Sequence, residues 1–139
     1  MLNKNYLRQL TLGILLLFTM LNLSAAEFPS KPIKIIVPFS PGGGSDVITR
    51  LLAEKMAADL GVSVLVENKP GASSIIGTEA MVKAAPDGYT ILMTNRAITV
   101  NPWLFKLPYD TAKITPVIQL VSSPLLLVSS TKAPFKTLN

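Results

Sequence analysis

The stretch of residues 35–48 constrains the fold more than any other, because it reads as a buried strand, a glycine-rich turn and the first turn of a helix. A short β-branched apolar run at 33–37 predicts the strand. Pro38 and Pro41 end this strand, since proline cannot donate a hydrogen bond to a sheet ladder. A strand that leads directly into a helix is typical of α/β folds.

Three consecutive glycines at 42–44 let the backbone turn sharply and expose main-chain N–H groups, and Gly43 is expected to have a positive φ. Ser45 or Asp46 is expected to cap the helix that follows. The N–H groups of a helix's first turn lack intrahelical partners, and the helix dipole adds a partial positive charge, so the turn favours a bound anion. A purely structural turn capped by Asp46 explains the same residues. The absence of a following lysine and of G-x-G-x-x-G spacing argues against a nucleotide.

Residues 1–26 are typical of a secretory signal peptide. Lys4 and Arg8 form a basic start, residues 10–23 are mostly apolar, and small residues at 24–26 predict cleavage after Ala26. The alternative is an uncleaved membrane anchor, but the apolar run is shorter than the ~20 residues that a spanning helix needs. Export and cleavage are therefore expected.

The composition excludes several classes of protein. The chain has no cysteine, so neither a lipoprotein anchor nor a disulfide framework can form. Without the two basic residues of the signal peptide, the formal charge falls from +5 to +3. The remaining basic residues are scattered, so no nucleic-acid partner is expected. Residues 27–139 suffice for one domain with a modest core.

The rest of the chain alternates helices with strands. Apolar runs predict further strands at 62–66 and 89–93. Apolar residues spaced by three and four predict helices at 45–60 and 75–85. Right-handed crossovers then place the three strands in one parallel sheet.

Three segments follow these strands and should gather at the carboxyl edge of the sheet, where open α/β folds bind ligands. They are the glycine turn, the turn at 70–74 and the segment 94–96. Ser73 or Ser74 is expected to cap the second helix. Two helix starts and Arg96 converging on one crevice suit a small anion such as a carboxylate. The alternatives are that Arg96 is only a surface charge and that Ser73 is only a cap.

The pattern changes in the last third of the chain. Residues 101–105 are expected to form a short helical turn, and 107–110 a tight turn. Two further strands are predicted at 117–121 and 125–129. Residues 132–139 look like a connector to a further element.

Separate blocks of the sequence match a known pattern. They lie at 28–39, 41–46, 64–72, 83–90, 101–102 and 107–110, and they include Pro41-Gly42-Gly43-Gly44-Ser45-Asp46, Glu67-Asn68-Lys69-Pro70-Gly71-Ala72 and Ala85-Pro86-Asp87-Gly88-Tyr89. Together, in this order, they resemble the Bug-type receptors, which are the periplasmic solute-binding proteins of tripartite tricarboxylate transporters. The resemblance covers nearly the whole chain after the signal peptide.

The resemblance implies an α/β, parallel-sheet lobe of a clamshell like that of type II periplasmic binding proteins, with the second lobe missing or incomplete. Residues 27–139 would form the amino-terminal lobe, and 101–139 would lead toward the absent one. Such receptors bind small carboxylates, largely through main-chain amides and waters, and deliver them to membrane transporter subunits. They are periplasmic, are not enzymes, and need no cofactor or metal. The implied ligand-binding residues, to which the convergence of segments adds Arg96, are Phe39, Ser40, Gly42, Gly43, Gly44, Ser45, Asp46, Ala72, Ser73 and Asn95.

The chain departs from the family pattern in three places. Ser73 and Ser74 stand where the family usually has further glycines, which changes the backbone freedom there. Arg96 stands where small residues are common, so it either contacts the ligand or obstructs its site. Family members continue past the equivalent of Asn139 into a second lobe, so the resemblance implies that this chain corresponds to the amino-terminal part of a receptor.

Two other interpretations are open. The first is a small secreted α/β hydrolase or transferase that uses Ser45 or Ser73. The chain has no histidine and no G-x-S-x-G elbow, so a Ser-His pair cannot form. Without histidine or cysteine, only scattered carboxylates could hold a metal. The second is a non-functional remnant whose residues record ancestry only.

Overall fold

The structure is a computed structural model that describes residues 27–124, 126, 128–130, 132 and 134. The element order is β1 (Ile33–Val37), α2 (Gly44–Leu60), β2 (Val64–Asn68), α3 (Ile75–Val82), β3 (Thr90–Leu92) and α4 (Ala97–Leu104). Two short 3-10 turns, Ala72–Ser74 and Thr111–Lys113, complete the set. None of the helices in the described part is long and apolar enough to cross a membrane. The predicted signal peptide lies outside the described residues.

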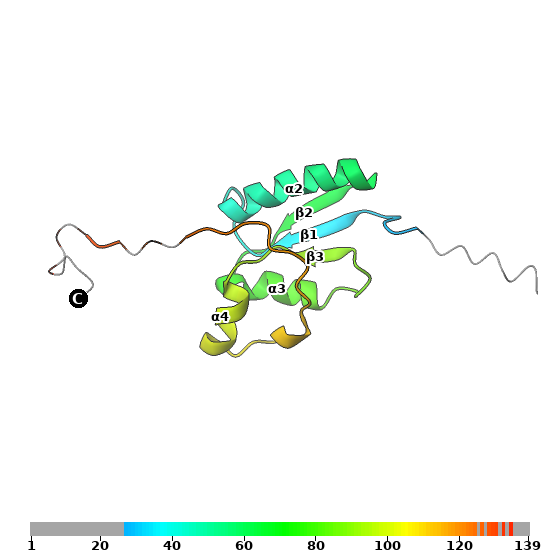
Figure 1. The fold of residues 1–139 in the computed structure, drawn as a ribbon. Helices are drawn as coiled ribbons and strands as arrows, with labels where there is room; N and C mark the ends of the chain where they lie inside the picture. Colours follow the sequence, from blue (N-terminus) through cyan, green and yellow to red (C-terminus); the bar gives the residue numbers. More distant parts are fainter. Residues whose placement is uncertain (1–26, 125, 127, 131, 133, 135–139) are drawn as a thin grey trace, which may run out of the picture.

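The three strands form one parallel sheet, as predicted, and their order is β2-β1-β3 (Figure 1). In the register, Ile35 of β1 lies beside Val66 of β2 and Ile91 of β3. The second strand begins two residues later than predicted, and the third is shorter than predicted at both ends.

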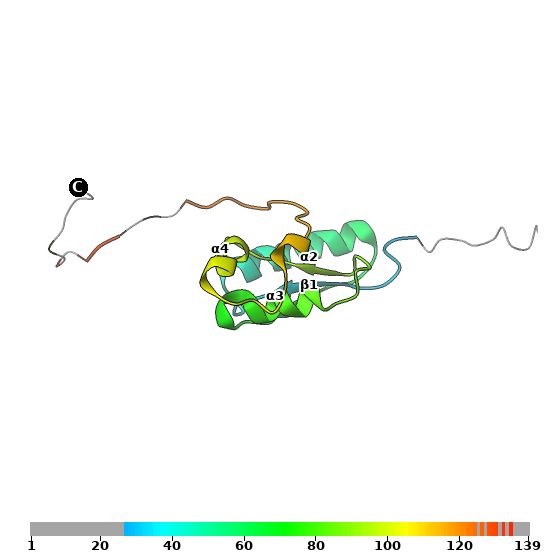
Figure 2. The ribbon, with the colours of Figure 1, turned by 90° about the horizontal axis from the view of Figure 1, so that it is seen from below.

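Two layers of helix cover the sheet. Helix α2 packs on one face, against β1 and β2, and α3 packs on the other face, against β1 and β3 (Figures 1 and 2). The central strand is therefore covered on both sides, which is why four of its five residues are buried and apolar. The exception is Lys34, which is exposed and pairs with Glu67 of β2 at 3.0 Å.

Helix α3 approaches the end of β1 very closely because one of its residues is glycine. A Cβ built on Gly77 would lie 2.7 Å from the Cβ of Pro38 and 2.8 Å from the carbonyl oxygen of Lys69. Only a residue without a side chain fits there. This contact brings the start of α3, and the turn before it, against the carboxyl edge of the sheet.

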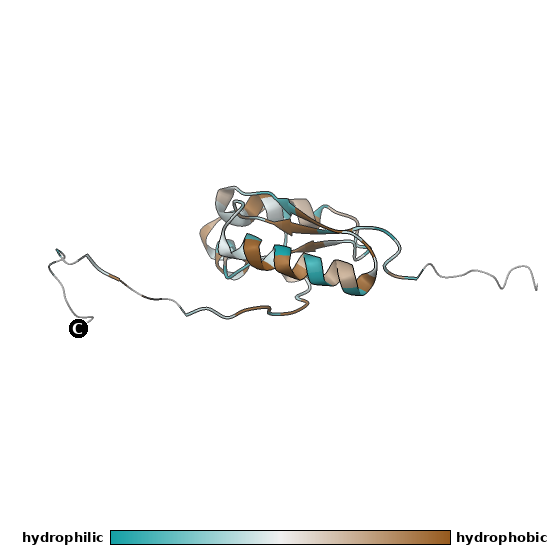
Figure 3. Cartoon of the chain, turned by 90° about the horizontal axis from the view of Figure 1, so that it is seen from above, coloured by the Kyte–Doolittle hydropathy of each residue, from teal (hydrophilic) through white to brown (hydrophobic). Residues whose placement is uncertain are grey.

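The predicted strand at 117–121 is wrong. These residues run out from the domain without a strand partner, and the side chains of Val117 and Ile118 are 87% and 75% exposed. A strand needs a neighbour to satisfy its backbone groups, and the described residues supply none beside this segment. Hydrophobic residues along the extended segment stand out in Figure 3. The predicted strand at 125–129 falls partly outside the described residues.

Candidate ligand-binding site at the carboxyl edge of the sheet

The glycine turn is built differently from the sequence expectation. Helix α2 begins at Gly44, and Gly43 occupies the N-cap position with φ −74° and ψ 164°. Neither Ser45 nor Asp46 caps the helix, because both lie inside its first turn. The glycine with a positive φ is Gly42, at 81°, and not Gly43.

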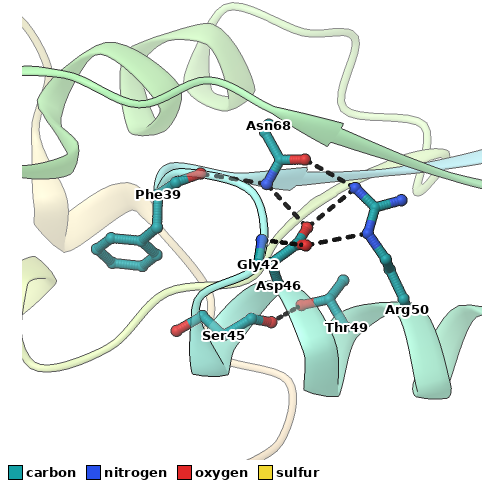
Figure 4. Close-up of polar contacts among 7 residues, drawn as sticks. All are labelled: Phe39, Gly42, Ser45, Asp46, Thr49, Arg50 and Asn68. Atoms are coloured by element: carbon teal, nitrogen blue, oxygen red, sulfur yellow. Dashed lines mark hydrogen bonds and ion pairs between the residues drawn. The ribbon is translucent and has the colours of Figure 1, made fainter.

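Asp46 instead forms the centre of a polar network between α2 and β2 (Figure 4). Its buried carboxylate accepts hydrogen bonds from the Gly42 amide at 2.9 Å, from Arg50 Nε at 3.0 Å and from Asn68 Nδ2 at 2.9 Å. Asn68 Nδ2 also donates to the Phe39 carbonyl, and Arg50 Nη2 donates to Asn68 Oδ1. This network joins the end of β1, the glycine turn and the end of β2.

The same contacts keep Asp46 ionised. The Arg50 guanidinium contributes most, followed by the Gly42 amide and the Asn68 side chain, and together they lower the pKa of Asp46 from 3.8 to about 2. The charge of Asp46 is thus paired with Arg50, and its carboxylate joins the glycine turn to the end of β2.

The network leaves several main-chain amides of the turn unused. The Gly42 N–H donates to Asp46, so this amide is not one of the exposed donors expected at the glycine turn. No acceptor within the described part of the chain pairs with the N–H groups of Gly43, Gly44 or Ser45. These three amides lie at the positive end of a 17-residue helix and can donate to an anion.

The turn between β2 and α3 contains three non-glycine residues with left-handed backbone. The φ values of Ala72, Ser73 and Ser74 are 45°, 53° and 75°. Such values suit glycine, which explains why serine at 73 and 74 is a real departure from a glycine-rich pattern. Ser74 occupies the N-cap position of α3, as one of the two predicted options, but its side chain makes no cap hydrogen bond.

A hollow of about 310 Å³ lies where these elements meet, and we call it the carboxyl-edge hollow. Four of its lining residues were expected from the sequence, namely Phe39, Ser73, Asn95 and Arg96. Three more were not, namely Ala97, Val100 and Asn101. The other expected site residues do not line it: Ser40, Gly42, Gly43, Gly44, Ser45, Asp46 and Ala72.

The unexpected lining residues come from α4, which begins four residues earlier than the predicted helical turn. Asn95 Oδ1 accepts a hydrogen bond from the Ala97 amide at 2.9 Å, so Asn95 was a local sign of a helix start. Asn101 is buried, and its Nδ2 donates to the Ser73 carbonyl at 2.7 Å. That bond ties α4 to the β2–α3 turn across 28 residues of sequence. No local sequence pattern predicts this hydrogen bond.

The carboxyl-edge hollow combines an apolar wall with a few polar donors. Phe39, Ala97 and Val100 are apolar, while Asn95, Asn101, Ser73 and Arg96 are polar. Among the residues that the structure describes, no group of three or more metal-ligating side chains occurs. The donors present suit an organic anion.

Comparisons with known proteins show which family this chain resembles. Residues 48–139 match the family described as "Tripartite tricarboxylate transporter family receptor". The chain belongs to this receptor family. One curated relative is Protein BugT of Bordetella pertussis, which is 38% identical over 120 residues, covering 84% of this chain and 37% of BugT. The chain spans about two-fifths of the length of the curated relatives that it matches.

Two solved structures of similar proteins share the fold of this chain. A periplasmic transporter structure is 46% identical, with a TM-score of 0.58, over 62% of this chain and 30% of that chain. MatC from Rhodopseudomonas palustris, solved with bound malate, is 32% identical, with a TM-score of 0.53 and the same coverage of both chains. Because each match covers only part of the neighbour, the α/β unit corresponds to one lobe of a larger binding protein.

Proposed function

We propose that the chain is the amino-terminal lobe of a periplasmic receptor that captures a small carboxylate for a tripartite transporter. The observation that carries the proposal is the row of unused amides at Gly43, Gly44 and Ser45, at the start of α2 and the carboxyl edge of the sheet. MatC, a similar protein, binds malate, which is a small carboxylate. The same class of ligand is proposed here.

The proposed mechanism is main-chain recognition. A carboxylate accepts hydrogen bonds from the free amides of the glycine turn, and the dipole of α2 strengthens them. Asp46 and Gly42 do not donate to the ligand in this mechanism, because the Gly42 amide already donates to the Asp46 carboxylate. Their bond fixes the conformation of the turn. Around the carboxyl-edge hollow, the Asn95 amide and the Ser73 hydroxyl are further donors, and Phe39 supplies apolar contact. Ser40 and Ala72 do not line the hollow, but each is the chain neighbour of a lining residue, Phe39 and Ser73 respectively. This is binding without catalysis, and the chain has no histidine to activate Ser45 or Ser73.

A proline at position 44 tests the mechanism. Gly44 is the first residue of α2, where proline is well tolerated, and Gly43 before it already has the extended backbone that a following proline requires. Gly44→Pro therefore deletes one unused N–H without breaking the helix. Calorimetry with malate should show binding weakened by about 1.5–3 kcal/mol, as for a hydrogen bond to a charged group.

Gly44→Ala is the matched control. It keeps the N–H, and its methyl group enters open space, with nothing within 4 Å. This variant should bind as tightly as the unchanged chain. Equal binding by the proline variant and the alanine variant would remove the glycine turn from the mechanism.

The periplasmic location depends on export, which we expect to end with cleavage after Ala26. The basic start, the apolar run and the small residues at 24–26 support this proposal. Mass spectrometry of the protein recovered from the periplasm should give a chain that begins at Glu27. A recovered chain that still begins near Met1 would contradict cleavage. The membrane subunits of the transporter would be the partners after export.

A further inference from the structure

We propose that Arg96 sets the charge selectivity of the carboxyl-edge hollow by binding a second acidic group of the ligand. The site would then prefer a compact dicarboxylate to a monocarboxylate of the same shape. The inference rests on the proposed function, since the first acidic group is the one bound by the glycine turn. It goes further because it assigns the discrimination between ligands to one side chain, that of Arg96.

Among the described residues that line the hollow, Arg96 is the only ionisable one. Its six companions are neutral, and three of them are apolar. The hollow therefore carries a formal charge of +1 from one guanidinium. A guanidinium presents paired N–H donors that match the two oxygens of a carboxylate.

Within the described part of the chain, no acidic side chain pairs with Arg96. All eight acidic residues of the chain lie in the described part, and none of them forms an ion pair with Arg96. Arg50 is a useful contrast, because it is bound to Asp46 and Asn68. The arginine of the network is therefore structural, while the arginine of the hollow is available to a ligand.

The backbone of Arg96 is nevertheless held in place. Its carbonyl oxygen accepts hydrogen bonds from the amides of Thr99 and Val100 at 3.1 and 3.2 Å, and from Thr99 Oγ1 at 2.9 Å. Asn95, the preceding residue, is fixed by its bond to the Ala97 amide. A long exposed side chain thus projects from a well-anchored point at the start of α4.

The two proposed anchors lie on neighbouring strands of the sheet. The glycine turn follows β1 and Arg96 follows β3, and β1 pairs directly with β3. Phe39 and Asn95 each lie three residues beyond the paired Ile36 and Leu92, and both line the hollow. Phe39 is four residues from Gly43, a separation of at most about 14 Å along the chain. We therefore expect a small molecule with an acid at each end of an apolar linker to contact both anchors.

Isosteric ligand pairs provide the test. Calorimetry on the full chain would compare succinate, glutarate and adipate with the monoamide of each, which keeps the shape and removes one charge. For at least one length, the diacid should bind about tenfold more tightly or better, the size expected for a hydrogen bond between charged groups. Arg96→Ala should abolish this preference by weakening the diacid alone, and Arg96→Lys should restore part of it.

Lys106→Ala is the control for a general loss of positive charge. Lys106 is exposed just beyond α4 and does not line the hollow, so this variant should keep the preference. Circular dichroism would check that each variant is folded.

Equal affinity of the unchanged chain for a diacid and its monoamide would overturn the inference while leaving the receptor function in place. Tighter diacid binding by Arg96→Ala would also overturn it, and would show that Arg96 obstructs the site. No binding of any of these compounds would refute the proposed function, and this inference with it.

Discussion

Within the glycine turn, one residue requires glycine for its backbone and its neighbour does not. Gly42 has a φ of 81°, whereas Gly43 is extended with a φ of −74°. A Cβ at Gly43 would meet only the Ser40 carbonyl, at an ordinary contact distance of 3.5 Å. The sequence-based expectation that Gly43 needs a positive φ is therefore wrong, and the requirement belongs to Gly42.

Alanine at these two positions should separate them. Gly42→Ala should lower the free energy of unfolding by about 1–2 kcal/mol, the cost of a left-handed backbone for a residue with a Cβ. Gly43→Ala should change it by less than about 0.5 kcal/mol, as for an unstrained surface site. Urea unfolding followed by circular dichroism measures both. A larger loss in the Gly43 variant would contradict the backbone assignment.

Asp46 should make stability depend on pH in the acid range. Its pKa is lowered from 3.8 to about 2 in the folded chain, so the unfolded chain binds a proton more readily as the pH falls. The stabilisation is therefore present above pH 3.8 and is lost between that value and about pH 2.

Unfolding in urea at a series of pH values tests this expectation. The unchanged chain should lose stability over this acid window, and Asp46→Asn should flatten that part of the profile while lowering stability at neutral pH. Asp59→Asn changes an exposed carboxyl of the same helix and should keep the slope. An unchanged slope in Asp46→Asn would show that other groups cause the acid loss.

Among the elements, α3 packs closely against the end of β1 at Gly77. Gly77→Ala would place a methyl group within 3 Å of Pro38 and of the Lys69 carbonyl, and both contacts involve backbone or a rigid ring. We expect this variant to lose about 1–3 kcal/mol of stability, the usual cost of overpacking. Because α3 carries the β2–α3 turn, the variant should also disturb the wall formed by Ser73.

Thermal unfolding with Gly44→Ala as the comparison measures this effect. Gly44→Ala adds the same methyl group to a helix where space is open, so it should be neutral or slightly stabilising. If the two variants melt together, α3 can move away from β1 at little cost. That result would show that the packing of α3 does not fix the position of the β2–α3 turn.

At the scale of the whole molecule, a large apolar surface is left uncovered. Trp103, Val117, Ile118, Leu126 and Val128 are between 75% and 89% exposed. Burial of such surface is worth about 25 cal/mol per Å². Domain stability as a whole is only about 5–15 kcal/mol. We therefore expect the isolated chain to be poorly stable or to associate with itself.

Sedimentation over a range of protein concentrations tests the self-association. The unchanged chain should form larger species as concentration rises, and a Val117→Lys, Ile118→Lys double variant should reduce them. A monomer at all concentrations, with a cooperative melt at high temperature, would contradict the expectation.

The sequence by itself determined the order of elements and the edge at which the site lies. The apolar run of β1 can be buried only between two layers, and the helices that alternate with strands require parallel crossovers. These features are encoded locally, through hydrophobic spacing and turn residues. The glycine turn, Ser73 and Arg96 could be assigned to one edge of the sheet on the same grounds, because each of them follows a strand of that sheet.

Only the tertiary structure decided how the polar groups of that edge are used. Asp46 could have capped a helix or faced a ligand, and contact with Asn68, 22 residues away, decides that it holds the glycine turn. Asn101 lines the hollow, and its side chain is held there by a hydrogen bond to the Ser73 carbonyl. The failure of 117–121 to form a strand has the same origin. A hydrogen bond or a ladder requires a partner, and the position of a partner distant in sequence is set by packing and not by local pattern.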